Sequence, residues 1–105
     1  MGNPRKDIKM TLLLWLELWY LKECNDDWEH KYGINIFTLA NPGWAVDICL
    51  KETYLEDENF PLIETERSKD DWVHCKVENN IFKGRGGPEN LEEMLLIFKR
   101  WAESF

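Results

Sequence analysis

Residues 25–33, with the sequence NDDWEHKYG, place carboxylates, an indole and an imidazole side by side directly after a strongly apolar segment. Carboxylates and imidazoles can bind metal ions or transfer protons, and a tryptophan among charges can contact a protein partner. The groups concerned are Asp26, Asp27, Trp28, Glu29 and His30. Three cysteines could act as nucleophiles or metal ligands, namely Cys24, Cys49 and Cys75.

A metal site is weakly supported by the spacing of these residues. Five residues separate Cys24 from His30, which is not a usual ligand spacing. His74 and Cys75 are neighbours on a predicted strand, so their side chains point to opposite faces. Packed cysteines and surface histidines are the simpler interpretation, and we expect no metal ion and no cofactor.

Catalysis is also weakly supported. A reactive thiolate needs backbone N–H donors or a helix N-terminus, but Cys49 and Cys75 fall within predicted strands. Cys24 falls near a helix C-terminus, where the helix dipole raises a thiol pKa. No glycine-rich phosphate loop or Ser-His-Asp set accompanies the carboxylates. The sequence therefore favours a protein that is not an enzyme; the alternative is a small cysteine- or metal-dependent enzyme, for example of the sulfurtransferase type.

Composition sets the broad class of the protein. The 105 residues suit a single domain, 1–105, and six Trp, five Phe and three Tyr give it a strongly aromatic core. The net charge of −7 argues against direct binding to nucleic acid or to an anionic membrane, and suits a partner with a basic face. No CxxC pair, secretory signal or membrane-length apolar stretch is present, so we expect a cytoplasmic protein with reduced thiols.

The elements in the first half of the chain follow from a change of period. Apolar spacing of three and four residues predicts a helix over 7–25, with Asp7 as its N-cap. The period then becomes two, and residues 33–51 predict a hairpin around Asn41-Pro42-Gly43, in which Gly43 can adopt a positive φ. The predicted core face of its second strand consists of Trp44, Val46, Ile48 and Leu50.

Two further strands are predicted in the second half of the chain. They span 60–68 and 70–80 and follow an acidic connecting loop at 52–59. The glycines and proline of 83–90 predict a flexible turn before a second amphipathic helix, for which Asn90 is the N-cap. The order α-β-β-β-β-α predicts an α+β fold, an antiparallel sheet of about four strands flanked by an N-terminal and a C-terminal helix.

Residues 15–50 carry a series of motifs, in order Trp19-Tyr20, Asp27-Trp28-Glu29-His30, Tyr32-Gly33-Ile34 and Asn41-Pro42-Gly43-Trp44. Together with DWVHCKV, FKGRGGPENLEE and FKRWAE further on, they resemble the immunity protein 53 family of bacterial polymorphic toxin systems. The resemblance covers most of the chain. It departs from the family at Asp26, where glycine is frequent, and at Ala40, where aspartate is frequent. We expect Asp26 to adopt left-handed backbone geometry at modest cost.

The resemblance implies a protein that binds and neutralises a cognate toxin without catalysis. Toxins that attack nucleic acid present basic clefts, so we expect a partner of the nuclease type with a basic face. Residues 52–71 hold eight acidic and two basic residues interspersed with aromatic rings. The predicted partner contacts are Tyr54, Glu56, Asp57, Glu58 and Phe60.

The run Asp27-Trp28-Glu29-His30 has two open interpretations. In the structural one, Trp28 packs over the junction of helix and sheet, while Glu29 and His30 hydrogen-bond the turn that enters the first strand. In the other, all four residues contact the partner, because they belong to the motifs that carry the resemblance.

Overall fold

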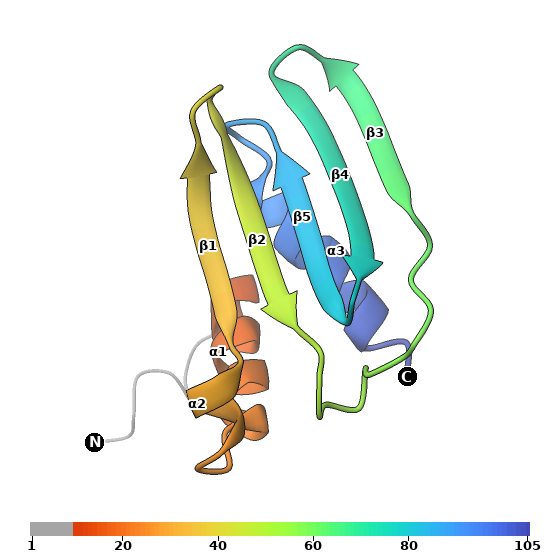
Figure 1. Cartoon of the computed structure of the whole chain (residues 1–105). Helices are drawn as coiled ribbons and strands as arrows, with labels where there is room; N and C mark the ends of the chain where they lie inside the picture. The colour runs from red at the N-terminus through yellow and green to blue at the C-terminus, as the bar shows by residue number, and fades with distance from the viewer. Residues whose placement is uncertain (1–9) are drawn as a thin grey trace, which may run out of the picture.

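Residues 10–105, the part of the chain that the computed structural model describes, form a five-stranded antiparallel sheet with two helices behind it (Figure 1). The helices are α1 (Leu12–Glu23) and α3 (Leu91–Ala102), and a single turn, α2 (Trp28–Lys31), precedes the first strand. The strands are β1 (Ile34–Leu39), β2 (Gly43–Cys49), β3 (Ile63–Ser68), β4 (Asp71–Glu78) and β5 (Ile81–Gly86). Their order in the sheet is β1-β2-β5-β4-β3. Within residues 10–105, no helix is long and apolar enough to cross a membrane.

The predicted α+β fold is confirmed, although the sheet has five strands rather than about four. The additional strand is β5, which occupies much of the 83–90 segment predicted as a flexible turn and lies at the centre of the sheet. Its glycines serve close packing: a Cβ on Gly84 would lie 3.0 Å from Met94 Sδ, and one on Gly86 3.1 Å from Asn90 Cβ. Glycine lets α3 lie directly on this strand.

The hairpin predicted around Asn41-Pro42-Gly43 is confirmed, since β1 pairs with β2 and Leu39 lies opposite Gly43. The reason given for Gly43 is wrong, because Gly33 has the positive φ among the described glycines. Gly43 is needed for another purpose: a Cβ there would lie 2.3 Å from the carbonyl oxygen of Gly86. The predicted core face is also confirmed, with three of its residues completely buried, Val46, Ile48 and Leu50.

α1 begins at a different cap from the predicted one, whereas α3 begins at the predicted residue with a different side-chain contact. The N-cap of α1 is Thr11, whose Oγ1 accepts a hydrogen bond from the Leu14 N–H at 3.0 Å; the predicted cap, Asp7, lies outside the described residues. Asn90 holds the N-cap position of α3 as predicted, but its side chain does not cap the helix. Instead its Nδ2 donates to Asp71 and to Glu93, and so ties the β3–β4 turn to the start of α3.

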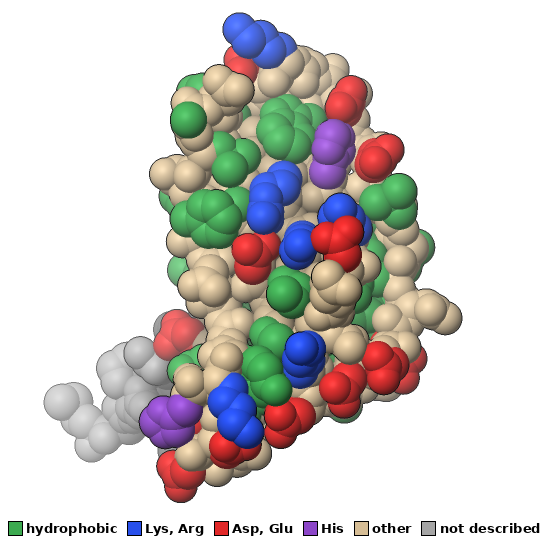
Figure 2. Space-filling model, viewed as in Figure 1, with side chains coloured by type: hydrophobic (Ala, Val, Ile, Leu, Met, Phe, Trp, Pro, Cys, Tyr) green, Lys and Arg blue, Asp and Glu red, His purple; other side chains and the backbone are tan. Residues whose placement is uncertain are grey.

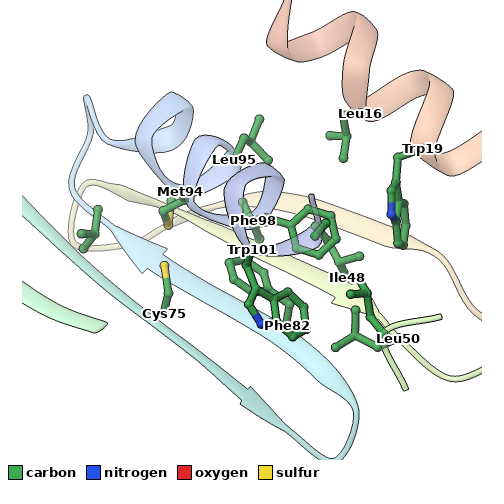
Figure 3. Close-up of a cluster of buried hydrophobic side chains, with 14 of the residues drawn as sticks. Leu16, Trp19, Ile48, Leu50, Cys75, Phe82, Met94, Leu95, Phe98 and Trp101 are labelled. Carbon is green, nitrogen blue, oxygen red and sulfur yellow. The ribbon is translucent and has the colours of Figure 1, made fainter. Parts of the chain in front are cut away.

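Aromatic rings from the helices and the sheet form the centre of the core (Figure 3). Phe98 of α3 packs edge-to-face on Trp19 of α1 and on Phe82 of β5, with ring centroids 5.2 and 5.1 Å apart. Each buried ring of this kind removes about 150–250 Å² from water, so this cluster supplies much of the hydrophobic stabilisation. The helices cover only one face of the sheet, and the face toward the viewer in Figure 1 is uncovered.

Candidate protein-binding site

The segment between β2 and β3, residues 50–62, crosses the end of the sheet below β5 and β4 (Figure 1); we call it the acidic loop. Leu55 anchors it in the core with no exposed surface. Asp57 and Asn80 exchange two hydrogen bonds, from the Asp57 N–H to Asn80 Oδ1 at 2.8 Å and from Asn80 Nδ2 to Asp57 Oδ1 at 3.0 Å. The carboxylates of Glu56 and Glu58 are exposed on this frame, and within residues 10–105 neither has an ion-pair partner.

The backbone of the acidic loop is held in one unusual conformation. Glu52 and Asp57 have φ values of 61° and 60°, which residues other than glycine rarely adopt. Glu52 is held in place by the Tyr32 hydroxyl, which donates to its carboxylate at 2.9 Å. Such strain persists only where surrounding contacts fix the chain, so the loop presents its carboxylates from a rigid frame.

Tyr54 connects the acidic loop to both long helices. Its hydroxyl accepts a hydrogen bond from Trp19 Nε1 and donates one to the Ala102 carbonyl, each at 3.2 Å. Burial raises the pKa of this hydroxyl, and the nearby carboxylates of Glu23 and Glu103 raise it further, so the donor proton is retained. The ring is nevertheless 49% exposed and lines a groove of about 490 Å³ with neighbours that include Leu18 and Phe105. The loop therefore adjoins a groove lined by aromatic and aliphatic side chains together with Lys22 and Glu103.

The electrostatic potential at this end of the molecule is negative for two reasons. α1 and α3 both end here, and the C-terminus of a helix carries a partial negative charge. Acidic side chains also gather along the lower end of the molecule, around the acidic loop and α2 (Figure 2). Glu103 is partly neutralised by Lys99 at 2.9 Å. The potential at this end of the molecule remains negative, which favours binding of a positively charged partner.

The acids of residues 52–71 do not form one surface. Glu66 lies on the uncovered face of the sheet, 3.1 Å from His74 Nε2. Asp71 lies at the far end of the sheet, where it binds Arg67 and Asn90. The sequence concentrates these acids in one segment, but the fold distributes them between opposite ends of the sheet.

Phe60 is partly buried and packs against the core, unlike the other residues predicted for this contact. Its ring packs edge-to-face against Phe82 and Trp101, with centroids 5.4 and 5.2 Å apart. Trp101 Nε1 also donates to the Asn59 carbonyl at 2.9 Å, which holds the end of the loop against α3. These contacts give Phe60 a role in packing the acidic loop onto the core.

Trp28 is likewise an interior residue, only 1% exposed. Its Nε1 donates to the Lys51 carbonyl at 2.9 Å, and its ring packs edge-to-face on Trp19 with centroids 6.2 Å apart. Trp28 therefore joins α1 to the start of the acidic loop. A ring in this position contacts a partner only if the surrounding structure opens.

The turn before α2 is held by Glu29. Its carboxylate accepts hydrogen bonds from the N–H groups of Asn25 and Asp26, at 2.9 and 2.8 Å. Backbone N–H groups, first its own and then those of Asn25 and Asp26, hold the pKa of this carboxyl below its usual value. Asp26 has a φ of 70°, so the expected left-handed geometry is confirmed. Glu29, which is partly buried, therefore stabilises this turn.

Asp27, the N-cap of α2, and His30 on α2 are exposed beside the acidic loop. Asp27 pairs with Lys31 at 3.2 Å, an exposed pair that contributes little to stability. Within residues 10–105, no hydrogen bond is made by the His30 ring. Both side chains therefore stand at the surface, next to the start of the loop that Trp28 contacts through Lys51.

The cysteines show no assembled catalytic arrangement within the described residues. Burial raises the pKa of the Cys75 thiol to about 12, so it is protonated and a poor nucleophile at neutral pH. Cys24 donates its thiol to the Tyr20 carbonyl at 3.3 Å, and Cys49 is partly exposed on β2. Over residues 10–105, no group of three or more His, Cys, Asp or Glu side chains is placed to hold a metal ion.

The uncovered face of the sheet is a second surface, and none of the contacts predicted from the sequence lies on it. Its charges are largely paired: Arg85 binds Asp47 at 2.9 Å, and Lys83 binds Glu78 at 2.9 Å. The Arg85 guanidinium also lies over the Phe37 ring, 5.5 Å from its centroid. Because these charges neutralise one another, this face attracts a charged partner less than the acidic loop does.

Fold and surfaces together define a small α+β protein with a rigid, acidic end. The family model described as Immunity protein 53 matches residues 13–103, which is most of the chain. The chain therefore belongs to the Immunity protein 53 family, as the resemblance predicted. No curated protein and no solved structure was found to match it.

Proposed function

We propose that this protein neutralises a cognate bacterial toxin by binding it and covering its surface, with no chemical bond made or broken. Membership of an immunity protein family supports a toxin partner. The observation that carries the choice of surface is the acidic loop, where Glu56 and Glu58 are exposed on a fixed backbone without ion pairs among the described residues.

The physical advantage of such a loop lies in both steps of binding. Clustered carboxylates accelerate the encounter with a basic partner by long-range attraction, which salt screens. A frame that is already ordered loses little conformational entropy when the complex forms. Tyr54 and the groove beside it add an aromatic anchor to the charges. A toxin with a basic active-site cleft, such as a nuclease, meets these conditions.

The proposed contact set is therefore narrower than the sequence suggested. It consists of Tyr54, Glu56, Asp57 and Glu58, with Asp27 and His30 of α2 at its border. Trp28, Glu29 and Phe60 are assigned supporting roles, because their contacts hold the loop and the turn before α2 in place.

The test is co-expression with the toxin encoded beside this protein, followed by association kinetics of the purified pair. The double variant Glu56→Lys/Glu58→Lys should lower the association rate constant roughly tenfold or more and flatten its salt dependence. Asp57 is left unchanged because it hydrogen-bonds Asn80.

Glu64→Lys/Glu66→Lys is the matched control, since it changes the net charge equally but lies on β3, away from the loop. An equal effect of both double variants would show that only net charge matters. No effect of either would overturn electrostatic steering, and failure of the unchanged protein to rescue cells or form a complex would overturn the function itself.

A further inference from the structure

The two edges of the sheet differ in how they are protected against pairing with other strands. The β3 edge carries Glu64, Glu66 and Arg67, and its register with β4 shifts between Glu66 and Ser68. Charges and bulges of this kind keep an edge from pairing. The β1 edge has neither, because the chain holds no charged residue from Tyr32 to Trp44.

The outer edge of β1 is also accessible. Ile36 and Phe37 in the middle of the strand are 40% and 43% exposed. The sequence INIFTL has no proline and no lysine, the residues that most often interrupt edge pairing. Six residues are a usual strand length, so β1 offers a full row of backbone groups to another strand.

Printed hydrogen bonds fix which backbone groups point outward. The Cys49 N–H donates to the Gly33 carbonyl at 3.0 Å, and on the other side of β2 the Leu50 N–H donates to the Asn80 carbonyl at 2.8 Å. Bonded residues alternate along an antiparallel strand. The N–H and C=O groups that point away from the sheet therefore belong to Ile34, Ile36 and Thr38.

We propose that a second copy of this chain pairs with β1 in antiparallel orientation about a two-fold axis at Ile36, making one continuous sheet across both copies. In this register, Ile36 lies opposite the partner subunit's Ile36, and Ile34 lies opposite the partner subunit's Thr38. Every outward N–H and C=O group of β1 then has a hydrogen-bonding partner. The side chain of Phe37 lies across from the partner subunit's Asn35.

The distribution of charge favours a second copy of this chain, rather than a basic toxin, as the partner that pairs with the β1 edge. The chain carries a net charge of −7, so two copies repel one another over most approaches. Pairing through β3 would bring Glu64 and Glu66 of both copies together, whereas pairing through β1 brings no charged residue opposite another. A basic toxin is complementary to the acidic loop and gains no attraction from an uncharged edge. The chain itself supplies an uncharged strand of equal length.

The neighbouring part of α1 fits the same partner. Leu13 and Tyr20 are exposed and line a groove of about 810 Å³ at the start of β1. Its lining combines these apolar side chains with two acidic and two basic residues, Glu17, Asp47, Lys31 and Lys51. The proposed register places the partner subunit's Ala40 opposite Tyr32, so the hairpin turn of one copy lies over the groove of the other. Apolar side chains of α1 that this chain leaves exposed are thereby covered.

The test measures the mass of the purified full chain, without toxin, over a range of concentrations by sedimentation. The unchanged protein should be a dimer. Ile36→Pro removes an outward N–H and no hydrogen bond to β2, so the fold should persist while the dimer weakens. Because the dimer is symmetric, the variant lacks this hydrogen bond twice, once from each copy. Two lost hydrogen bonds correspond to an increase in the dissociation constant of about thirtyfold.

Glu64→Pro is the matched control on the β3 edge. The Gly87 N–H donates to the Trp72 carbonyl at 3.0 Å, and the alternation continued through β4 makes the Glu64 N–H an outward one. This variant should remain dimeric. Ile36→Lys keeps the backbone donor but adds a charge to each copy at the axis, and it should also give monomers. If Ile36→Pro lowers the helical and sheet signal in circular dichroism, Ile36→Lys is the variant that tests dimerisation.

Three results would overturn the proposal. The first is an unchanged protein that stays monomeric at every concentration. The second is a dimer that Ile36→Lys leaves intact. The third is a monomer whose toxin binding is lost on Ile36→Lys, which would assign this edge to the toxin. Dimerisation does not depend on the proposed toxin contact, so either can fail while the other stands.

Discussion

Replacing Trp28 by phenylalanine separates the structural role of the 27–30 segment from a role in binding. The change removes the donor to the Lys51 carbonyl and shrinks a ring that is 1% exposed and packs on Trp19. The lost ring contacts correspond to about 1 kcal/mol, and the unpaired carbonyl to about 1 kcal/mol more. We expect the free energy of unfolding to fall by about 2 kcal/mol.

The assay is urea unfolding followed by far-ultraviolet circular dichroism, since fluorescence would change with the tryptophan itself. A loss of this size should also lower the melting temperature by about 10 °C in a chain of this length. His30→Gln is the control, because the His30 ring is exposed on α2; we expect its unfolding free energy to stay within about 0.5 kcal/mol of the unchanged protein.

Toxin affinity is then measured for both variants under conditions where each is folded. We expect Trp28→Phe to keep its affinity despite its lower stability. If Trp28→Phe unfolded like the unchanged protein but bound toxin more weakly, the ring would be a contact residue and the assignment of Trp28 to the interior would be refuted.

Further measurements test the turn, the thiols and the close packing of the hairpin. Backbone N–H groups lower the pKa of Glu29 from its ordinary 4.5, so its ionised form stabilises the fold above that pH and the benefit is lost as pH falls through the lowered pKa. Glu29→Gln should remove this part of the stability profile in urea unfolding from neutral to acid pH; an identical profile would contradict the role. Since the pKa of Cys75 is raised to about 12, a disulfide reagent at neutral pH should modify Cys24 and Cys49 in the folded protein and Cys75 only after unfolding, whereas rapid modification of Cys75 would refute its burial. Gly43→Ala should lower the unfolding free energy by about 2 kcal/mol or more, because its Cβ would lie 2.3 Å from a carbonyl oxygen; unchanged stability would mean that β2 can move away from β5.

The parts of the fold that the sequence predicts are those governed by local spacing. The alternation in β2 predicts its buried face because successive side chains on a strand point to opposite sides. The position of Asn90 is likewise local, since a polar residue before an amphipathic run marks a helix start. The direction of its amide is not local, because Asp71, which accepts its hydrogen bond, belongs to the β3–β4 region.

β5 could not be recognised because its composition results from a distant helix. Gly84 and Gly86 lie on the face where Met94 and Asn90 approach, and a Cβ at either position would lie only 3.0–3.1 Å from these residues, so the neighbour would have to shift. In a single sequence, glycines selected for close packing resemble glycines selected for a turn. The distinction requires knowledge of which segment lies above the strand.

In the candidate site, too, some features follow from the local sequence and others depend on distant contacts. The exposure of Glu56 and Glu58 follows from composition, because carboxylates are rarely buried without partners. The burial of Phe60 and Trp28 does not, since each is fixed by residues more than twenty positions away, such as Phe82 and Lys51. An aromatic residue in an acidic segment therefore predicts either a contact or an anchor until the fold is known.

The acidic loop joins the inner strand β2 to the edge strand β3 and bypasses the two strands between them. Apart from Leu50, whose N–H donates to the Asn80 carbonyl, none of its residues pairs with a strand of the sheet. The exposed charges of Glu56 and Glu58 can therefore be changed without altering the pairing of any strand, while buried Leu55 continues to hold the connection on the core.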